Sequence, residues 1–170
     1  MTSLPVAVAE GGNLLCWRLE REFYFSEWHL GEGSYRVGGR FSSNGRRIIY
    51  TSLDPSTAIL EVAVHKGFYA LDISPHVLMS ISIPISPTTA IVVMPSDVSN
   101  PNWLRPSKLS PNQQKFGDQQ LDKTGILIIP SVVSGHSWNC LIDAARFPEL
   151  KSYLLSDERF ALDTRLVPMS

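Results

Sequence analysis

Residues 47–66, RIIYTSLDPSTAILEVAVHK, contain the transition that decides the fold. The first part, Arg47–Ser52, is rich in β-branched residues, carries a tyrosine and is typical of a strand. Asp54 is a favourable N-cap, and Pro55 suits the first position of a helix. The sequence therefore predicts a strand that leads almost directly into a helix, which runs to about Lys66 and ends at the glycine that follows.

Short apolar or β-branched runs predict further strands on both sides of this unit. They cover residues 14–19, 77–85, 90–94, 126–129 and 159–167. The glycine-rich stretch 31–45 and the stretch 96–111 are expected to be loops, and the glutamine-rich residues 112–123 to form a second helix. Strands mixed with one or two helices, without repeats or a linker, predict a single α+β domain over residues 1–170.

The composition excludes several classes of protein. Fifteen Lys and Arg residues against 16 Asp and Glu residues give a net charge of -1, which does not build the positive field that nucleic-acid binding requires. The charged fraction of 18% is low and hints that another chain covers part of the surface.

Cysteine and histidine spacing argues against a metal site. Cys16 and Cys140 are far apart in the sequence and form no CxxC pair, and the four histidines lack the spacing of metal ligands. We expect two free thiols in a cytoplasmic protein. No stretch has the pattern of a signal peptide or the length of a membrane span.

Two arginines are candidates for binding an anion. Arg40 ends the segment Gly38-Gly39-Arg40, where flexible backbone and a guanidinium suit a phosphate or carboxylate, although the glycines could serve only a turn. Arg18 lies inside an apolar strand, so it must either form an ion pair or line a cavity.

Glu61 is the candidate carboxylate. It lies in the middle of the predicted helix among apolar residues, and His65 at i+4 is its one ionisable helix neighbour. Such a carboxylate could stabilise charge or transfer a proton in a pocket, or it could lie on the polar face of an amphipathic helix.

Ser131 and Asn139 are candidates at the ends of apolar runs. Ser131 follows the predicted strand 126–129 and could face a cleft, and Asn139 could donate a hydrogen bond or simply occupy a turn. No GxSxG elbow surrounds Ser131, so a triad with His136 and Asp143 is unsupported. The glycines form neither a P-loop nor a GxGxxG motif.

Taken together and in order, these segments resemble the RES domain family over about residues 14–166. The segments are Trp17-Arg18-Leu19, Gly38-Gly39-Arg40-Phe41, Ile49-Tyr50-Thr51-Ser52, Ala58-Ile59-Leu60-Glu61-Val62, Ile129-Pro130-Ser131, Asn139-Cys140-Leu141-Ile142 and Asp163-Thr164-Arg165-Leu166. The Arg, Glu and Ser from which the family takes its name correspond by this resemblance to Arg40, Glu61 and Ser131.

The resemblance implies a fold similar to the ADP-ribosyltransferases and the function of a bacterial toxin. Such a toxin would cleave the nicotinamide–ribose bond of NAD+ and deplete it, with water, phosphate or a protein as the acceptor. Its partner would be an Xre-type antitoxin with a helix-turn-helix domain that blocks the pocket, in a hetero-oligomer built on a toxin homodimer. Neither a metal nor a cofactor beyond NAD+ itself is expected.

The chemistry of NAD+ assigns a role to each candidate residue. Arg18 and Arg40 could anchor the pyrophosphate, and Glu61 could stabilise the oxocarbenium-like sugar that forms as nicotinamide leaves. By resemblance, Tyr50 could stack on nicotinamide or bind a ribose hydroxyl, and Ser131, with Asn139, could bind the amide or a phosphate.

Two alternatives remain open. The same pocket could transfer ADP-ribose to a specific protein, or the domain could be a catalytically silent binding module whose arginines are structural.

Overall fold

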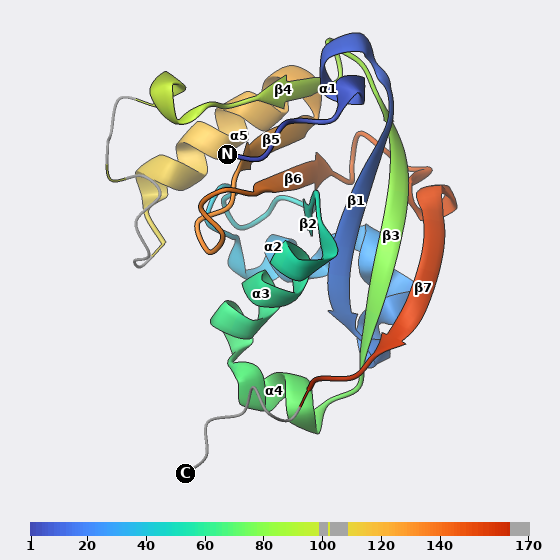
Figure 1. Cartoon of the computed structure of the whole chain (residues 1–170). Coiled ribbons are helices and arrows are strands. Elements are labelled where there is room, and N and C mark those ends of the chain that lie inside the picture. The colour runs from blue at the N-terminus through green and yellow to red at the C-terminus, as the bar shows by residue number, and fades with distance from the viewer. Residues whose placement is uncertain (99–101, 103–108, 164–170) are drawn as a thin grey trace.

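The computed structural model describes residues 1–98, 102 and 109–163, and these residues form one seven-stranded sheet with helices around it (Figure 1). The strand order is β4-β5-β6-β2-β1-β3-β7, and every neighbouring pair is antiparallel except β4–β5. The strands are β1 Gly12–Arg21, β2 Ile48–Ser52, β3 His76–Ile85, β4 Ala90–Val92, β5 Ile126–Pro130, β6 Trp138–Asp143 and β7 Leu154–Phe160. The predicted α+β architecture with a mixed sheet is confirmed.

The helices lie between and beside the strands. The α-helices are α1 Val6–Glu10, α2 Glu32–Val37, α3 Pro55–Lys66, α4 Phe68–Ile73 and α5 Pro111–Thr124, and the 3-10 helices are η1 Glu22–Leu30, η2 Pro95–Asp97 and η3 Leu150–Tyr153. Among the residues that the structure describes, every helix is too short or too polar to cross a membrane.

The unit formed by β2 and α3 follows the sequence prediction closely. Asp54 caps α3, because its Oδ1 accepts a hydrogen bond of 2.8 Å from the Thr57 amide. The helix ends at Gly67, whose φ of 80° favours a residue without a side chain. The strands predicted over 14–19, 77–85, 90–94 and 126–129 and the helix predicted over 112–123 are confirmed with small shifts of their ends.

Three predictions about local structure were wrong. The stretch 31–45 is not all loop but contains α2, which lies between Gly31 and Gly38, both with positive φ. The last strand, β7, begins earlier than predicted and ends at Phe160, while residues 164–167 of that prediction lie outside the described residues. Residues 138–143, for which no strand was predicted, form β6. Most of the loop predicted over 96–111 also lies outside the described residues.

The sheet changes direction between β2 and β1, and this change positions the site. In Figure 1, β4, β5 and β6 run across the view, whereas β1, β3 and β7 run down it. A single residue pair, Trp17 and Ser52, joins β1 to β2 in register, so the two strands diverge on either side of it. β2 is therefore the strand at which the two halves of the sheet meet.

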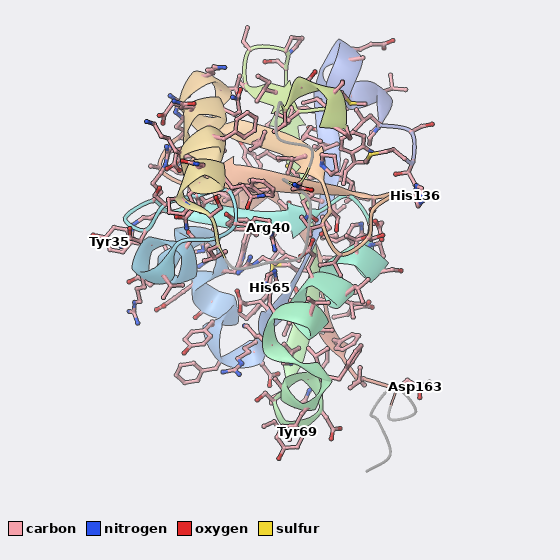
Figure 2. All side chains as sticks on the ribbon, turned by 90° about the vertical axis from the view of Figure 1, so that its left-hand side faces the viewer. Tyr35, Arg40, His65, Tyr69, His136 and Asp163 are labelled. Atoms are coloured by element: carbon pink, nitrogen blue, oxygen red, sulfur yellow. The ribbon has the colours of Figure 1, made fainter. Side chains whose placement is uncertain are left out.

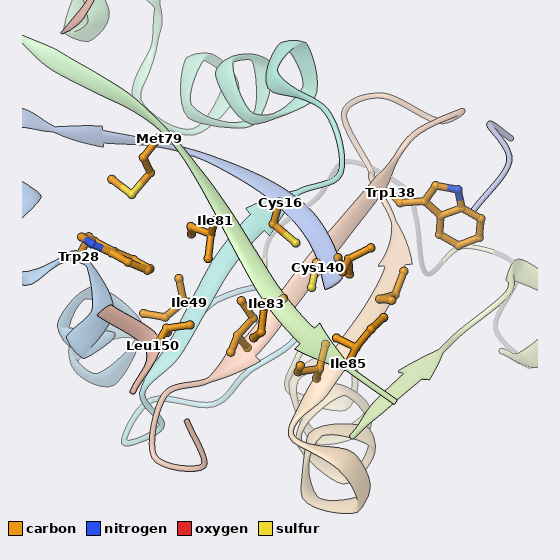
Figure 3. Packing of buried hydrophobic residues seen from close by; sticks show 14 residues of the cluster. Cys16, Trp28, Ile49, Met79, Ile81, Ile83, Ile85, Trp138, Cys140 and Leu150 are labelled. Carbon is orange, nitrogen blue, oxygen red and sulfur yellow. The ribbon is translucent and has the colours of Figure 1, made fainter. Parts of the chain in front are cut away.

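Buried side chains fill both faces of the sheet. The largest cluster contains Trp28 of η1, Ile81 of β3 and the two free cysteines, Cys16 and Cys140 (Figure 3). A second cluster lies under α5, and a third lies between α3, α4 and the ends of β1 and β3. The helices α3 and α5 thus rest on the sheet at separate places, near opposite ends of β2.

Candidate active site

Glu61 points from α3 toward the ends of three neighbouring strands. Its Oε1 accepts hydrogen bonds from Asn139 Nδ2 at 2.6 Å and from Ser131 Oγ at 2.9 Å. Its Oε2 lies 3.5 Å from Nε2 of His65, one turn further along the helix. Ser131 directly follows β5, and Asn139 is the second residue of β6. The structure thus brings together three of the residues that the sequence singled out.

These contacts keep the Glu61 carboxyl group ionised. Burial alone would raise its pKa, but hydrogen bonds from His65, Asn139 and Ser131 together hold the pKa below its ordinary value. The side chain is 19% exposed, so Glu61 is not sealed inside the protein. The result is a fixed negative charge in a partly buried place, which can stabilise a cation that forms next to it.

Ser131 orients this carboxylate. While its Oγ donates to Glu61, the same oxygen accepts hydrogen bonds from the amides of Val133 at 3.2 Å and Ser134 at 2.9 Å. The residue is completely buried. A hydroxyl held in this way is poorly placed to attack a substrate, and its contacts make it a positioning residue for Glu61.

The Asn139 amide is fixed at both ends. Its Oδ1 accepts a hydrogen bond of 2.8 Å from Ser52 Oγ, and its Nδ2 donates to Glu61. Ser52, the last residue of β2, is directly opposite Asn139 in the register of β2 and β6. The end of β2 therefore supports the carboxylate through one intermediate side chain.

The turn that carries Arg40 rests on Tyr50 of β2. The Tyr50 hydroxyl lies 2.8 Å from Ser42 Oγ and accepts a 3.2 Å hydrogen bond from the Phe41 amide. A Cβ on Gly39 would come within 2.6 Å of Tyr50 Cζ, so this position requires glycine. Burial raises the pKa of Tyr50 to about 12, although the hydrogen bonds to Ser42 and Phe41 and the nearby Arg40 charge act in the opposite direction.

Helix α5 holds the same turn from its other side. Gln114 Nε2 donates a 2.9 Å hydrogen bond to the Gly39 carbonyl, and the Ser43 amide donates to Asp118 at 3.2 Å. Gly117, between them, lies against the backbone of Phe41. The Arg40 turn is thus clamped between a strand and a helix and has little freedom to move.

Arg40 and His65 face the same side of the molecule. Figure 2 shows both in the middle of one face, with α5 above them and α3 below. Arg40 is half-buried. A guanidinium and a carboxylate with its histidine therefore occupy one face, where an anionic ligand with a reacting centre nearby could lie across them.

Arg18 has different surroundings. It forms an ion pair with Glu20, and its Nη1 donates a 2.8 Å hydrogen bond to the Tyr50 carbonyl. Its guanidinium thus connects β1 to β2 where the two strands diverge. The sequence predicted that Arg18 either forms an ion pair or lines a cavity, and the structure shows the ion pair. A role for Arg18 in binding pyrophosphate stays a prediction.

The described residues contain neither a serine triad nor a metal cluster. Asp143 pairs with Arg46 at 3.1 Å, and His136 Nδ1 lies 3.4 Å from the N-terminal amine, so neither contacts Ser131. Within residues 1–98, 102 and 109–163, no three His, Cys, Asp or Glu side chains gather to hold a metal ion. A shallow hollow at the start of α3, lined in part by Asp54 and Thr57, lies beside Glu61 without including it.

Sequence reasoning assigned no role to Ser52, Gln114 or Asp118. The contacts of these residues join segments 75 or 87 positions apart, which no local pattern reveals. One signal was available for α5, because residues at i, i+3 and i+4 share a helix face, and Gln114, Gly117 and Asp118 have this spacing. Ser52 gave no such signal.

Comparisons with known proteins agree in placing the chain. A family model described as "RES domain" matches residues 15–163. The chain is 28% identical over 155 residues to a Pseudomonas putida protein named "Toxin Res", covering 90% of this chain and 99% of the relative. It is 27% identical over 158 residues to a "Toxin Res" of Photorhabdus laumondii, covering 91% and 97%.

A solved structure shares the fold. It is described as "Crystal structure of the M.tuberculosis MbcT-MbcA toxin-antitoxin complex" and matches with a TM-score of 0.70 over 89% of this chain and 86% of that chain. At 14% identity the likeness establishes the fold alone.

Proposed function

The chain belongs to the RES domain family, as its ordered motifs predict, and from this premise we propose that it is a toxin that cleaves the nicotinamide–ribose bond of NAD+. The observation that carries this proposal is the Glu61 carboxylate, held ionised by Ser131, Asn139 and His65.

Cleavage of NAD+ needs a group of the kind that Glu61 supplies. When the bond between C1′ of the ribose and the nicotinamide nitrogen breaks, its electron pair leaves with nicotinamide, which becomes neutral. The positive charge then lies on the ribose as an oxocarbenium-like centre. A carboxylate fixed beside that centre stabilises charge that exists only in the transition state, and this lowers the barrier.

Arg40 supplies the matching cation. The two negative charges of the NAD+ pyrophosphate suit a guanidinium, which can bind phosphate oxygens through two parallel hydrogen bonds. The clamped turn between Tyr50 and α5 holds Arg40 in place before the substrate arrives, so little entropy is lost on binding. Water or phosphate would then add to C1′ of the ribose.

The partner proposed for this chain is an Xre-type antitoxin that covers the site. One solved structure with the same fold is described as a toxin–antitoxin complex, which supports an antitoxin partner here. The low charged fraction of 18% is consistent with a surface that another protein covers. The helix-turn-helix character of the antitoxin and a toxin homodimer inside the complex remain part of this proposal.

Nicotinamide release from NAD+ tests the proposed reaction. The purified, antitoxin-free chain is incubated with NAD+ with and without phosphate, beside Glu61→Gln and the control Glu158→Gln, which changes an exposed carboxylate on the distant strand β7. We expect release by the parent and by the control, and at least a hundredfold slower release by Glu61→Gln with its fold intact by circular dichroism. Faster release with phosphate would identify phosphate as the acceptor.

Three results would contradict the proposal. Release by folded Glu61→Gln at the rate of the parent would remove Glu61 from the mechanism. No release by the folded parent, with labelled ADP-ribose appearing on one protein of a lysate, would show transfer to a protein in place of NAD+ depletion. No labelling and no release would leave the silent binding module.

A further inference from the structure

Ser52 ends β2 in a place where its hydroxyl has one partner. Its side chain is 2% exposed, and its Oγ donates a 2.8 Å hydrogen bond to Asn139 Oδ1. The register of β2 and β6 sets Ser52 directly opposite Asn139, so the contact follows from the pairing of the two strands. A polar group buried in this way is normally hydrogen-bonded, and among the described residues this is the one side-chain hydrogen bond of Ser52.

An ionised carboxylate only accepts hydrogen bonds, so Glu61 takes the donor end of the Asn139 amide, and the acceptor end, Oδ1, faces Ser52. The Ser52 hydroxyl donates to Oδ1 and holds the amide from that end, with Nδ2 pointing the other way. In that direction Nδ2 reaches Glu61 Oε1 at 2.6 Å. The reverse orientation would bring the amide oxygen against the carboxylate, where the two oxygens would repel each other.

We infer that Ser52 is a positioning residue of the active site: its hydroxyl holds the Asn139 amide in place from the Oδ1 end, and the amide in turn fixes the direction of the Glu61 carboxylate. This inference rests on the proposed function for its catalytic consequence. Its structural content, the chain Ser52–Asn139–Glu61, is independent of which substrate binds. Ser52 itself touches no reacting atom.

The charged surroundings of Glu61 determine how this can be measured. On its own helix it faces His65, and from the segment 131–139 it faces the uncharged Ser131 and Asn139. A His65→Gln background leaves Glu61 as the one ionisable side chain of this cluster, so the acid limb of a pH–rate profile measured there reports the carboxylate.

The matched control is Ser80→Ala. Ser80 is also a strand serine, is also 2% exposed, and forms one side-chain hydrogen bond, to Ser156 Oγ, on the other half of the sheet. Ser52→Ala and Ser80→Ala thus delete the same atom from equally buried strand positions. A difference in activity between the two variants therefore depends on where the hydroxyl lies in the protein. It cannot be explained by the loss of a buried hydroxyl alone.

We expect Ser52→Ala to lower kcat for nicotinamide release about tenfold with little change in KM, and to shift the acid limb to higher pH. The limb moves in this direction because a misoriented amide no longer favours the charged form of Glu61, so its pKa rises. Ser80→Ala should leave kcat and the limb as in the parent. A folded Ser52→Ala with the kcat and the acid limb of Ser80→Ala would overturn the inference.

A second measurement needs no activity. NMR should show a scalar coupling across the hydrogen bond from Asn139 Nδ2 to the Glu61 carboxylate carbon in the parent and in Ser80→Ala, and this coupling should be lost in Ser52→Ala. The same coupling in Ser52→Ala as in Ser80→Ala would also overturn the inference. The NMR coupling does not depend on NAD+. An inactive parent would therefore refute the proposed function, and the spectra of the two variants would still decide the role of Ser52.

Discussion

Gly117→Ala tests whether the Arg40 turn is clamped as tightly as the structure indicates. Gly117 lies inside α5, where glycine ordinarily costs about 0.5–1 kcal/mol relative to alanine. By propensity alone the substitution should therefore stabilise the protein. A Cβ at this position, however, would overlap the Phe41 carbonyl oxygen and lie 2.7 Å from the Phe41 carbonyl carbon.

The two effects have opposite signs, and their sizes can be compared. The overlap involves backbone on both sides, so the helix and the turn must separate, and overpacking of this kind costs roughly 1–3 kcal/mol. Subtracting the propensity gain leaves a net loss of about 0–2.5 kcal/mol, with a midpoint slightly above 1 kcal/mol. For a chain of this length each 1 kcal/mol shifts Tm by about 2–4 °C, so we expect Tm to fall by about 2–5 °C at the midpoint and by about 10 °C at most.

Gly33→Ala in α2 is the matched control. Gly33 is also helical, its φ is not positive, and a Cβ there would meet no heavy atom within 4 Å. Thermal unfolding should show an unchanged or slightly higher Tm for this variant, and nicotinamide release should fall only for Gly117→Ala. A Gly117→Ala protein as stable and as active as Gly33→Ala would refute the clamp between α5 and the Arg40 turn.

Two further predictions concern ionised groups. Arg46→Met should lower the free energy of unfolding in urea by about 2–4 kcal/mol, because it leaves the mostly buried carboxylates of Asp118 and Asp143 without their guanidinium. The exposed ion pair of Arg36 and Glu32 provides the control. Arg36→Met should lower the free energy of unfolding by at most about 0.5 kcal/mol. Because the folded-state pKa of Glu61 lies below its ordinary value of 4.5, the carboxylate contributes stability that is present above that value and lost as the pH falls through the folded-state pKa. The stability difference between the parent and Glu61→Gln should thus shrink as the pH falls from about 5 to about 3, and a constant difference in denaturant titrations would contradict the lowered pKa.

The sequence singled out Glu61 because this residue conflicts with its local pattern. Glu61 interrupts an apolar helix, and a charge that local structure does not require calls for an explanation from tertiary structure. Arg40 became a candidate in another way, because the two glycines before it suit the binding of an anion and because it matches the arginine of the RES family. Conflict with the local pattern also selected Arg18, for which the structure gives an ion pair with Glu20.

The polar side chains that orient those charges could not be recognised in the same way. Serine at the end of a strand and glutamine on a polar helix fit their local patterns, so Ser52 and Gln114 conflict with nothing. Their roles arise only when β2 pairs with β6 and α5 packs beside the turn. The strand β6 was missed for a related reason, since a short run buried on both faces lacks the alternation that marks a half-exposed strand.

The two halves of the site share one strand, and the period of that strand explains how. Tyr50 and Ser52 are two positions apart in β2, so they lie on the same face of the sheet. Tyr50 supports the turn of Arg40, and Ser52 supports Glu61 through Asn139. Thr51 between them points to the opposite face, where its hydroxyl donates to the Cys140 carbonyl.

The spacing between the cation and the carboxylate is therefore set by the backbone of β2. A slip of one residue in the pairing of β2 with β6 would turn both Tyr50 and Ser52 to the other face and remove both supports together. Burial on each face works against such a slip, because Ile49 is fully buried on the face that Thr51 shares, while Ile48 is buried under α5. The packing that specifies the fold thus also fixes the spacing between the Arg40 turn and the Glu61 carboxylate.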